Sequence, residues 1–335
     1  NSSFIIIIIN NNNNNNNNKN IIYTSDEIDN YNQQYSGAIS SYYINDDNKL
    51  IFINRVSSGG ANPCHLALNE ENTFLYVSNY CSGTLSVISI NNDGSLNEPS
   101  QVLRFNSNEV TTCDYPGSSH IHEVTFTSSN KILVNDLGHN CIYSFNINSN
   151  GLLDITPTSI TTISIPSSGP RHLVLHQSNS YVFIINELLN TITSYYYDVN
   201  SNSLGNEIQT ISTLRSWESN DGMAAAEIQI SKDGKYLYGS NRDLSSPNLG
   251  RSSIVVYQID QSSGKLTLLQ HISTYGEQPR HFNFFNNETL IVVGNLKTNS
   301  VYTFERNIYT GLINEYPLSS VVVDSPTHIL SYSEN

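Results

Sequence analysis

Histidine and basic side chains gather at repeated positions along this chain. Six of the nine histidines lie where short β-strands are expected to begin: His65, His120, His122, His172, His281 and His328. Four basic residues occupy similar strand openings or closings: Arg171, Arg242, Arg280 and Lys297. Guanidinium and imidazole groups collected in one concave site are suited to binding a carboxylate or a phosphate. We therefore expect a site for a small anionic ligand.

Arg171, Glu187 and Arg242 are the first candidates for chemistry. An unpaired guanidinium near the centre of a fold is costly, and Glu187 and Arg242 stand where other repeats carry Tyr or Leu. Glu227 replaces a recurrent histidine and has two interpretations, a ligand-binding carboxylate or a neutralising partner of Arg242. Some recurrent histidines have a structural interpretation as hydrogen-bonding partners of a neighbouring repeat: His65, His281 and His328.

A hairpin of fixed spacing is expected to position these residues. A strand that opens on a Pro-x-His-like triplet is followed, fifteen residues after its histidine, by the position just after an Asn or Asp that closes a second strand. The pairs are His65 and Tyr80, His122 and Leu137, His172 and Glu187, Glu227 and Arg242, and His281 and Leu296. The openings recur every 47 to 57 residues, and short-strand repeats of this length are typical of propeller blades.

Seven such openings predict an all-β fold, a seven-bladed β-propeller. They begin at Asn1, Pro63, His120, Pro170, Ala225, Pro279 and Pro326. Alternating β-branched and aromatic residues separated by turns such as Asn92-Asp93-Gly94 favour strands throughout. Because a propeller divides its core among blades, we expect residues 1–335 to form one domain.

The two ends of the chain and one insertion refine this prediction. Only five residues follow the opening at Pro326–Leu330. The last blade therefore lacks partner strands, and we expect a missing N-terminal segment of about 40 residues to supply them. The Asn10–Asn18 run lengthens the first hairpin by eight residues, and we expect it in a surface turn, where insertions cost little.

Composition excludes several classes of partner. The formal net charge of −14 disfavours nucleic acid and anionic membranes, and no apolar run reaches membrane-spanning length. Four cysteines, Cys64, Cys81, Cys113 and Cys141, show neither a CxxC pair nor metal-ligand spacing. This cysteine pattern favours a reducing, cytoplasmic compartment, and we expect neither a metal nor another cofactor.

A set of short segments, in order along nearly the whole chain, resembles the seven-bladed lactonase family. That family includes propeller-type 6-phosphogluconolactonases and carboxy-cis,cis-muconate cyclases. The segments are Gly60-Ala-Asn-Pro-Cys-His-Leu66, Val77-Ser-Asn-Tyr80, His120-Ile-His-Glu-Val124, Asn135-Asp-Leu-Gly138, Gly169-Pro-Arg-His-Leu173, Ile185-Asn-Glu-Leu188, Ala225-Ala-Glu-Ile228, Ser240-Asn-Arg242 and Gln278-Pro-Arg-His281. Two departures from the family pattern are the longer segment Asp243–Ser253 and His281 in place of an Asn.

The resemblance implies an active site built from His122, Arg171, Glu187 and Arg242. We choose His122 over His120 because the fifteen-residue spacing aligns it with His65 and His172. The preferred reaction is hydrolysis of a sugar δ-lactone, 6-phosphogluconolactone, in the pentose phosphate pathway. Glu187 or His122 would act as the base. The residues expected to bind substrate are His120, Glu227, Arg280 and Lys297.

Two other functions stay open at this point. A muconate cyclase-type enzyme would use the same arginines to bind carboxylates, with His or Glu moving the proton. A non-catalytic propeller would instead bind proteins on its rim, but a scaffold needs no such asymmetric set of inner charges.

Overall fold

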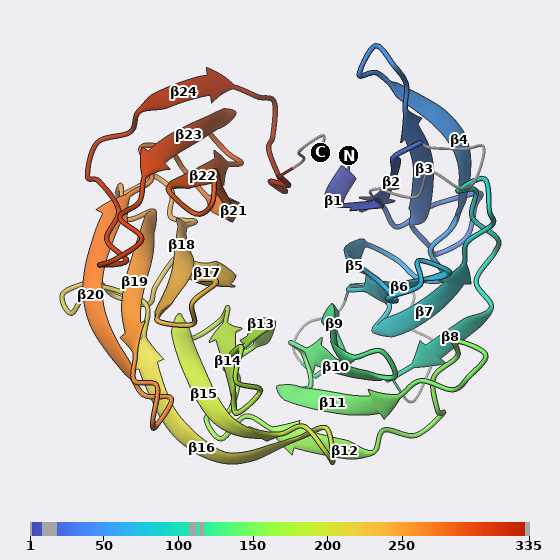
Figure 1. Ribbon diagram of the computed structural model, residues 1–335, viewed down its shortest axis with the longest axis horizontal. Coiled ribbons are helices and arrows are strands. Elements are labelled where there is room, and N and C mark those ends of the chain that lie inside the picture. The colour runs from blue at the N-terminus through green and yellow to red at the C-terminus, as the bar shows by residue number, and fades with distance from the viewer. Residues whose placement is uncertain (1, 9–18, 107–111, 114–116, 332–335) are drawn as a thin grey trace. The chain divides into compact units, whose positions relative to one another are not determined.

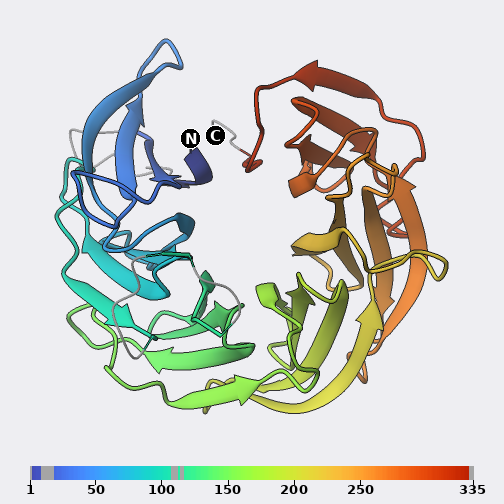
Figure 2. The ribbon, with the colours of Figure 1, turned by 180° about the vertical axis from the view of Figure 1, so that it is seen from behind.

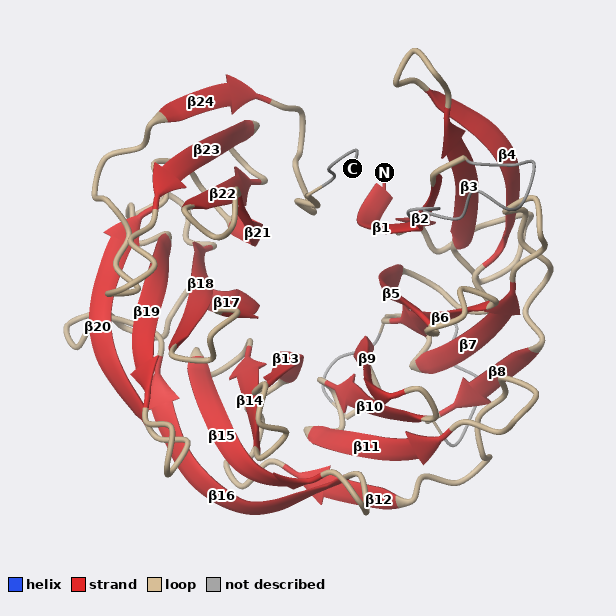
Figure 3. Ribbon diagram, in the orientation of Figure 1, coloured by secondary structure: helices blue, strands red, loops and turns tan. Residues whose placement is uncertain are grey.

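The computed structural model describes residues 2–8, 19–106, 112–113 and 117–331 (Figure 1). The Asn10–Asn18 run lies outside these residues, so its expected place in a turn stays a prediction. The described residues form strands and loops and contain no α-helix (Figure 3). Accordingly, no helix long and apolar enough to cross a membrane occurs among them. The predicted all-β class is confirmed.

Strands that follow one another in the chain form six antiparallel sheets of four strands each, and every sheet is a simple meander (Figure 2). The chain divides into two compact units, residues 1–160 and 161–335, with the boundary inside the last strand of the third sheet. Four-stranded meanders of this kind are propeller blades. Six are present among the described residues, and the predicted seventh is not one of them.

The first unit holds three sheets. The strands of the first sheet are β1 (Ser2–Ile8), β2 (Ile21–Asp26), β3 (Ala38–Ile44) and β4 (Leu50–Ser57). The second sheet consists of β5 (Pro63–Leu68), β6 (Phe74–Asn79), β7 (Thr84–Ser89) and β8 (Gln101–Arg104). The third consists of β9 (Ile121–Ser128), β10 (Lys131–Asp136), β11 (Cys141–Asn146) and β12 (Ser159–Thr162).

The second unit holds the other three. Its first sheet consists of β13 (Pro170–Leu175), β14 (Tyr181–Asn186), β15 (Thr191–Asp198) and β16 (Ser203–Ser212). The next is formed by β17 (Met223–Ile230), β18 (Tyr236–Asp243), β19 (Ser253–Ile259) and β20 (Leu266–Ser273). The last is formed by β21 (Pro279–Phe285), β22 (Leu290–Asn295), β23 (Ser300–Glu305) and β24 (Ser319–Val322).

Apolar side chains are buried between neighbouring sheets rather than in one central core. In the second unit, Phe183 and Leu237 belong to the cluster between its first two sheets, and Tyr238 and Phe282 to the cluster between its last two. The first unit has two similar clusters. Each sheet is therefore held in place by burial against its neighbours in the same unit.

A repeated hydrogen bond joins neighbouring sheets. A buried tyrosine hydroxyl on a second strand donates to the carbonyl of a turn glycine in the next sheet: Tyr23 to Gly94 (3.1 Å), Tyr76 to Gly151 (2.6 Å) and Tyr238 to Gly311 (2.7 Å). These glycines have φ of 84°, 79° and 72°, a conformation that glycine adopts without steric cost. The turn predicted at Asn92-Asp93-Gly94 is confirmed.

The predicted strand-closing Asn or Asp is confirmed in four hairpins and wrong in the fifth, where β18 continues past Asn241 and Arg242 to Asp243. Asn79, Asp136, Asn186 and Asn295 end their strands, and all four are fully buried. Asn186 shows why an amide is needed, because its Nδ2 donates to the hydroxyls of Thr191 and Thr193 on the next strand. Buried side-chain amides must be satisfied in this way. The residue after each closing position therefore leaves the sheet from a fixed point.

Candidate active site

A β-bulge sets the direction of Arg171. In the β13–β14 hairpin Pro170 pairs with Asn186 and His172 with Ile185, so Arg171 is the extra residue between them. The hairpin of β21 and β22 repeats this register, with Arg280 as its extra residue between Pro279 and His281. A bulge redirects the side chain of its extra residue and is common beside functional sites. Each Pro-Arg-His triplet therefore sets the direction of its arginine side chain.

Three of the four predicted catalytic residues meet in the second unit. Oε2 of Glu187 lies 3.1 Å from Nε of Arg171 and 3.1 Å from Nη2 of Arg242. The Arg171 contact is an ion pair without the alignment of a hydrogen bond. The Arg171 side chain is 4% exposed, whereas that of Glu187 is 20% exposed. One carboxylate oxygen thus holds two guanidinium groups, and the Glu187 side chain is partly exposed.

The opening of β17 supplies further acceptors for both arginines. Nη1 of Arg171 donates to the carbonyl of Ala226 at 2.8 Å, and Nη2 of Arg242 donates to the carbonyl of Ala225 at 3.1 Å. The strand opening predicted at Ala225 thus lies inside β17, which begins at Met223.

Arg171 and Glu187 are both ionised at neutral pH, although burial disfavours the charged form of each. Burial lowers the pKa of Arg171 to about 10, with the charge of Arg242 as the next cause, so the guanidinium remains protonated at neutral pH. Burial alone would raise the pKa of Glu187, but the charges of Arg242 and Arg171 outweigh it and lower this pKa below its usual value. Glu187 is therefore a carboxylate at neutral pH, with reduced proton affinity.

Glu227 lies beside this group in a second buried cluster. Its Oε2 is 2.9 Å from Nδ1 of His172 and 3.5 Å from Nε2 of His281, while Gln229 donates to Oε1. Burial drives the pKa of both His172 and His281 well below the ordinary value, so both imidazoles are neutral at pH 7. Burial also raises the pKa of Glu227. The carboxylate is thus engaged by neighbouring side chains.

The seventh predicted opening packs against this cluster. The ring of His328 lies 3.9 Å from the ring of His281, and the backbone N–H of Ile329 donates to Nδ1 of His281 at 3.2 Å. The structural interpretation of His281 is confirmed within the second unit, whereas a hydrogen-bonding role of His328 stays a prediction.

His122 and His120 belong to the first unit, where they pack around Tyr80. His120 stacks on the Tyr80 ring with centroids 4.6 Å apart, and its Nδ1 lies 3.1 Å from the Tyr80 carbonyl oxygen. His122 meets the same ring edge-on at 5.7 Å. His120 is fully buried and His122 is 5% exposed. Tyr80 was not among the predicted site residues, although it follows a closing Asn as Glu187 does.

The pairing register corrects the sequence alignment of His122. Ile121 pairs with Asp136 and Glu123 with Asn135, so His122 is the extra residue of a bulge. It is therefore equivalent to Arg171 rather than to His172, and Glu123 takes the histidine position. The fifteen-residue spacing was wrong by one here because the β9–β10 hairpin has one residue fewer between the bulge and its closing Asp.

The remaining predicted residues come from the β21–β22 hairpin of the second unit and the turn that follows it. Arg280 is partly buried, and its charge acts on the pKa of Arg171 and of Glu187. Lys297 is exposed, two residues beyond the end of β22. Among the described residues no group of His, Cys, Asp or Glu is arranged to hold a metal ion.

A disulfide joins Cys81 and Cys113, whereas Cys64 and Cys141 are buried thiols outside any disulfide. The cysteine spacing favoured a reducing compartment, and this bonded pair is at odds with that prediction. No short motif signals the bond, because its cysteines lie 32 residues apart. Cys81 directly follows Tyr80, so the bond anchors the segment that leads to His120.

Comparison with known proteins gives this arrangement a family. The family model described as "Lactonase, 7-bladed beta-propeller" matches residues 14–331. The chain belongs to this lactonase family. It is 32% identical to the 6-phosphogluconolactonase of Formosa agariphila over 90% of this chain and 83% of that protein. It is 29% identical to the enzyme of the same name from Bacillus subtilis, over 87% and 79% of the two chains.

A solved structure in the same group agrees. The crystal structure of a putative 6-phosphogluconolactonase from Bacteroides fragilis matches with a TM-score of 0.80 and 27% identity, covering 98% of this chain and 86% of that one. The resemblance expected from the short segments is thereby confirmed, and so is the propeller fold.

Proposed function

We propose that this lactonase hydrolyses 6-phosphogluconolactone to 6-phosphogluconate, a step of the pentose phosphate pathway. The observation that carries the proposal is the pair of guanidinium groups on one oxygen of Glu187, beside a third arginine. Three cations against one carboxylate on a partly exposed side chain favour an anionic ligand in a chain whose net charge is −14. The names of the relatives support the choice of lactone.

The chemistry requires a water molecule, a base and a cation. Water attacks the lactone carbonyl carbon and gives a proton to the base, while the carbonyl oxygen becomes an oxyanion. Collapse of this intermediate breaks the ring C–O bond, and the released oxygen takes up a proton to give the open hydroxy acid. Arg171 and Arg242 are assigned to the developing oxyanion, because preorganised donors act most strongly where charge appears.

Glu187 and His122 remain the two candidate bases. The solvent-facing part of Glu187 could accept a proton from water, but its lowered pKa makes it a weak base. His122 occupies the bulge position equivalent to Arg171 in its own hairpin. We assign proton transfer to one of these two residues and leave the choice to experiment.

The other predicted residues receive different weights. Arg280 and Lys297 are assigned to the substrate phosphate. Glu227 is bound by His172, His281 and Gln229, and His120 is fully buried. In our proposal Glu227 and His120 support neighbouring side chains. This role replaces the direct substrate contact that was expected from the sequence.

The proposal also includes the finer architecture. We propose one domain with seven blades, in agreement with the description of the family model. The segment at Pro326–His328, which packs beside His281 in the second unit, would open the seventh blade.

A cytoplasmic location follows from the proposed pathway, but the cysteines no longer support it. Disulfides persist mainly in oxidising compartments, and Cys81 is bonded to Cys113. Protein trapped with a thiol-blocking reagent at the moment of cell lysis decides between the two locations. Four blocked cysteines would support the cytoplasm, and two would support an oxidising compartment.

A substrate panel tests the function. Purified protein is assayed with 6-phosphogluconolactone, unphosphorylated gluconolactone and carboxymuconolactone, using initial rates at or below neutral pH to limit spontaneous hydrolysis. We expect the highest kcat/KM for the phosphorylated lactone. Arg171→Ala and Arg242→Ala should each reduce kcat by about a hundredfold or more. Preference for carboxymuconolactone would favour a cyclase-type enzyme, and no turnover of any lactone would favour a binding scaffold.

A further inference from the structure

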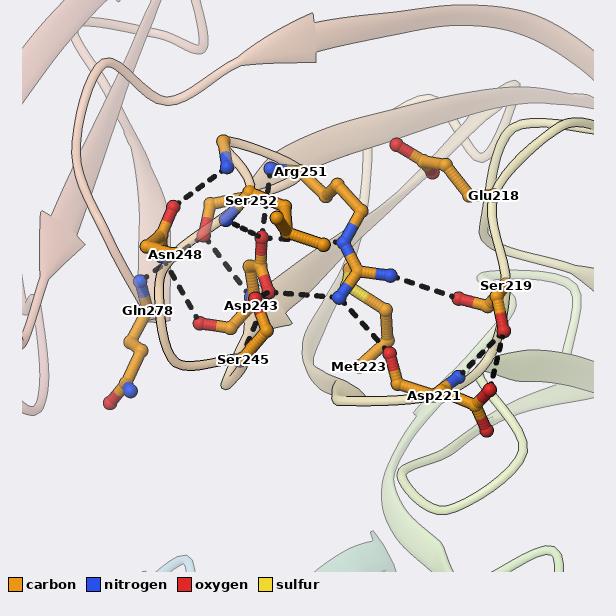
Figure 4. Close-up of polar contacts among 12 residues, drawn as sticks. Glu218, Ser219, Asp221, Met223, Asp243, Ser245, Asn248, Arg251, Ser252 and Gln278 are labelled. Carbon is orange, nitrogen blue, oxygen red and sulfur yellow. Dashed lines mark hydrogen bonds and ion pairs between the residues drawn. The ribbon is translucent and has the colours of Figure 1, made fainter.

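The loop that follows Arg242 is built around one buried carboxylate. Asp243 ends β18, and β19 begins at Ser253. Asp243 is fully buried. Its Oδ1 accepts the N–H of Ser245 at 3.1 Å, and its Oδ2 accepts the N–H of Leu249 at 3.0 Å (Figure 4). The carboxylate therefore organises the segment 244–252 from inside, as a closed turn.

Arg251 returns from the far side of this loop to the same carboxylate. Its Nη2 lies 3.0 Å from Oδ1 of Asp243, and its Nε lies 3.3 Å from Oδ2, a two-point contact (Figure 4). The guanidinium also donates to the carbonyl oxygens of Ser219 at 3.3 Å and Asp221 at 3.0 Å. One planar group thus ties the loop 244–252 to the loop 213–222.

The second loop reaches the strand end that carries Glu187. Asn220 donates from Nδ2 to the carbonyl of Leu188 at 3.0 Å, and Leu188 is the next residue after Glu187. Asn190 in turn donates to the carbonyl of Met223, the first residue of β17. The loop held by Arg251 is therefore in direct contact with the backbone beside the shared carboxylate.

The first loop also reaches the strand that carries Arg280. The hydroxyl of Ser252 accepts the N–H of Asp243 at 3.2 Å and the N–H of Gln278 at 3.3 Å. Gln278 immediately precedes the bulge whose extra residue is Arg280. The Ser252 hydroxyl thus links the backbone of Asp243 to the backbone of Gln278. These contacts hold the two segments in position and involve no charged group.

We propose that Asp243 and Arg251 are positioning residues of the lactonase reaction, which they serve by fixing the strand ends that carry Arg242, Glu187 and Arg280. This inference rests on the proposed function. A frame of this kind is needed because like charges repel: the charges of Arg242 and Arg280 both act to lower the pKa of Arg171, after burial as the largest cause. Guanidinium groups held close together separate unless the backbone behind them is rigid.

Arg251→Lys is the central variant. Lysine keeps the positive charge but cannot make the two-point contact with Asp243 or span both carbonyls of the second loop. Misplacement of a reacting group by about 1 Å can cost about a hundredfold in rate. We expect kcat/KM for 6-phosphogluconolactone to fall by about 10- to 100-fold, with most of the loss in kcat.

Arg306→Lys is the matched control in the same unit. Arg306 is also buried, and its Nη1 lies 3.3 Å from Oε2 of Glu288. It follows the end of β23 that pairs with Leu290, whereas the site lies beyond the other end of β22, after Asn295. The two variants lose similar contacts. Compared at equal folded fraction by circular dichroism, the control should keep kcat/KM within about twofold of wild type.

A double variant tests whether Arg251 acts through Arg242. Residues that act as a unit give non-additive losses. Arg251→Lys should lower kcat/KM by a smaller factor in the Arg242→Ala background than in wild type, because one of the three positioned groups is already absent. The same factor in both backgrounds would show that Arg251 does not act through Arg242 and would overturn the proposal.

The outcomes separate this inference from the proposed function. If the wild type hydrolyses the lactone and Arg251→Lys has the same kcat/KM as Arg306→Lys, the positioning role is wrong and the proposed lactonase function is retained. If the wild type hydrolyses no lactone, the proposed function is wrong, and binding of 6-phosphogluconate by calorimetry decides the inference. At least tenfold weaker binding in Arg251→Lys than in Arg306→Lys supports it, and equal or absent binding overturns it.

Discussion

At the scale of single residues, the sharing of one oxygen of Glu187 by two arginines decides how the site can work. Both guanidinium groups lie 3.1 Å from that oxygen, and their charges lower the pKa of the carboxylate despite its burial. A carboxylate of low proton affinity is a good anchor for cations and a poor base. The geometry therefore gives Glu187 two possible contributions that kinetics can separate.

Glu187→Gln separates these contributions. Glutamine keeps the shape and an oxygen acceptor but is not basic. If Glu187 is the base, the variant should stay folded, bind 6-phosphogluconate and lose most of its kcat. If Glu187 only orients the arginines, the loss should be smaller and should fall mainly on KM. Steady-state kinetics with a parallel product-binding measurement give the answer, and wild-type kinetics would remove Glu187 from both roles.

The buried carboxylate of Asp243 is expected to make the free energy of unfolding depend on pH. Burial alone would raise its pKa, but hydrogen bonds from Arg251 and Ser245 lower it below the usual value of 3.8. A carboxylate with a depressed folded-state pKa stabilises the fold above its unfolded-state pKa and loses that effect as pH falls further.

Asp243→Asn should therefore be less stable than wild type by about 3–5 kcal/mol at pH 7, the cost of breaking a buried ion pair. The gap should narrow steadily below about pH 4, where the carboxylate takes up a proton in unfolded wild type while its lowered pKa keeps it ionised in the folded protein. Urea unfolding at several pH values measures the gap, and a constant difference across this range would contradict the assignment.

At the scale of elements, a single extra residue in a hairpin takes one side chain out of the regular pairing register. Arg171, Arg280 and His122 are each the extra residue of a bulge at the opening of a first strand. The next residue returns to the regular register, as His172 and Glu123 do. In the proposed function, the extra residue takes part in the reaction, and the residue after it has a structural role.

His122→Asn and Glu123→Gln test this division. His122→Asn should lower kcat by about a hundredfold if His122 takes part in proton transfer, with little change in melting temperature. Glu123 accepts from Asn135 at 3.0 Å and lies 3.9 Å from His65. Glu123→Gln should therefore mainly lower the melting temperature. The reverse pattern, a stability loss in His122→Asn and an activity loss in Glu123→Gln, would show that the register argument fails.

The sequence predicts these elements better than their register. Strand openings, closing Asn or Asp residues and turn glycines are visible because each has a local steric or hydrogen-bonding reason, as Gly94 and Asn186 show. The bulge at His122 is not visible in the sequence, because it depends on the hairpin having one residue fewer between His122 and its closing Asp136. The Asp243–Arg251 pair is hidden for a related reason, since a longer loop is visible in the sequence but its internal contacts are not.

At the scale of the whole molecule, stability is distributed over interfaces between sheets. Each unit has two apolar clusters between neighbouring sheets, so no single core dominates. Connections that reach beyond one sheet gain importance in such a fold. The Cys81–Cys113 disulfide is one of them, because it ties the end of β6 to the segment that leads into β9.

The variant Cys81→Ser/Cys113→Ser measures this connection. A crosslink between residues 32 apart restricts the unfolded chain, and its loss should lower the free energy of unfolding by roughly 3–4 kcal/mol. Tyr80 adjoins Cys81 and stacks on His120, so kcat should fall as well. Cys64→Ser is the control, since it removes a buried thiol that takes no part in the crosslink. Thiol titration of denatured, unreduced wild type should find two thiols, Cys64 and Cys141. Four thiols would mean that the bond does not form in the folded protein, and stability should then be unchanged by the double substitution.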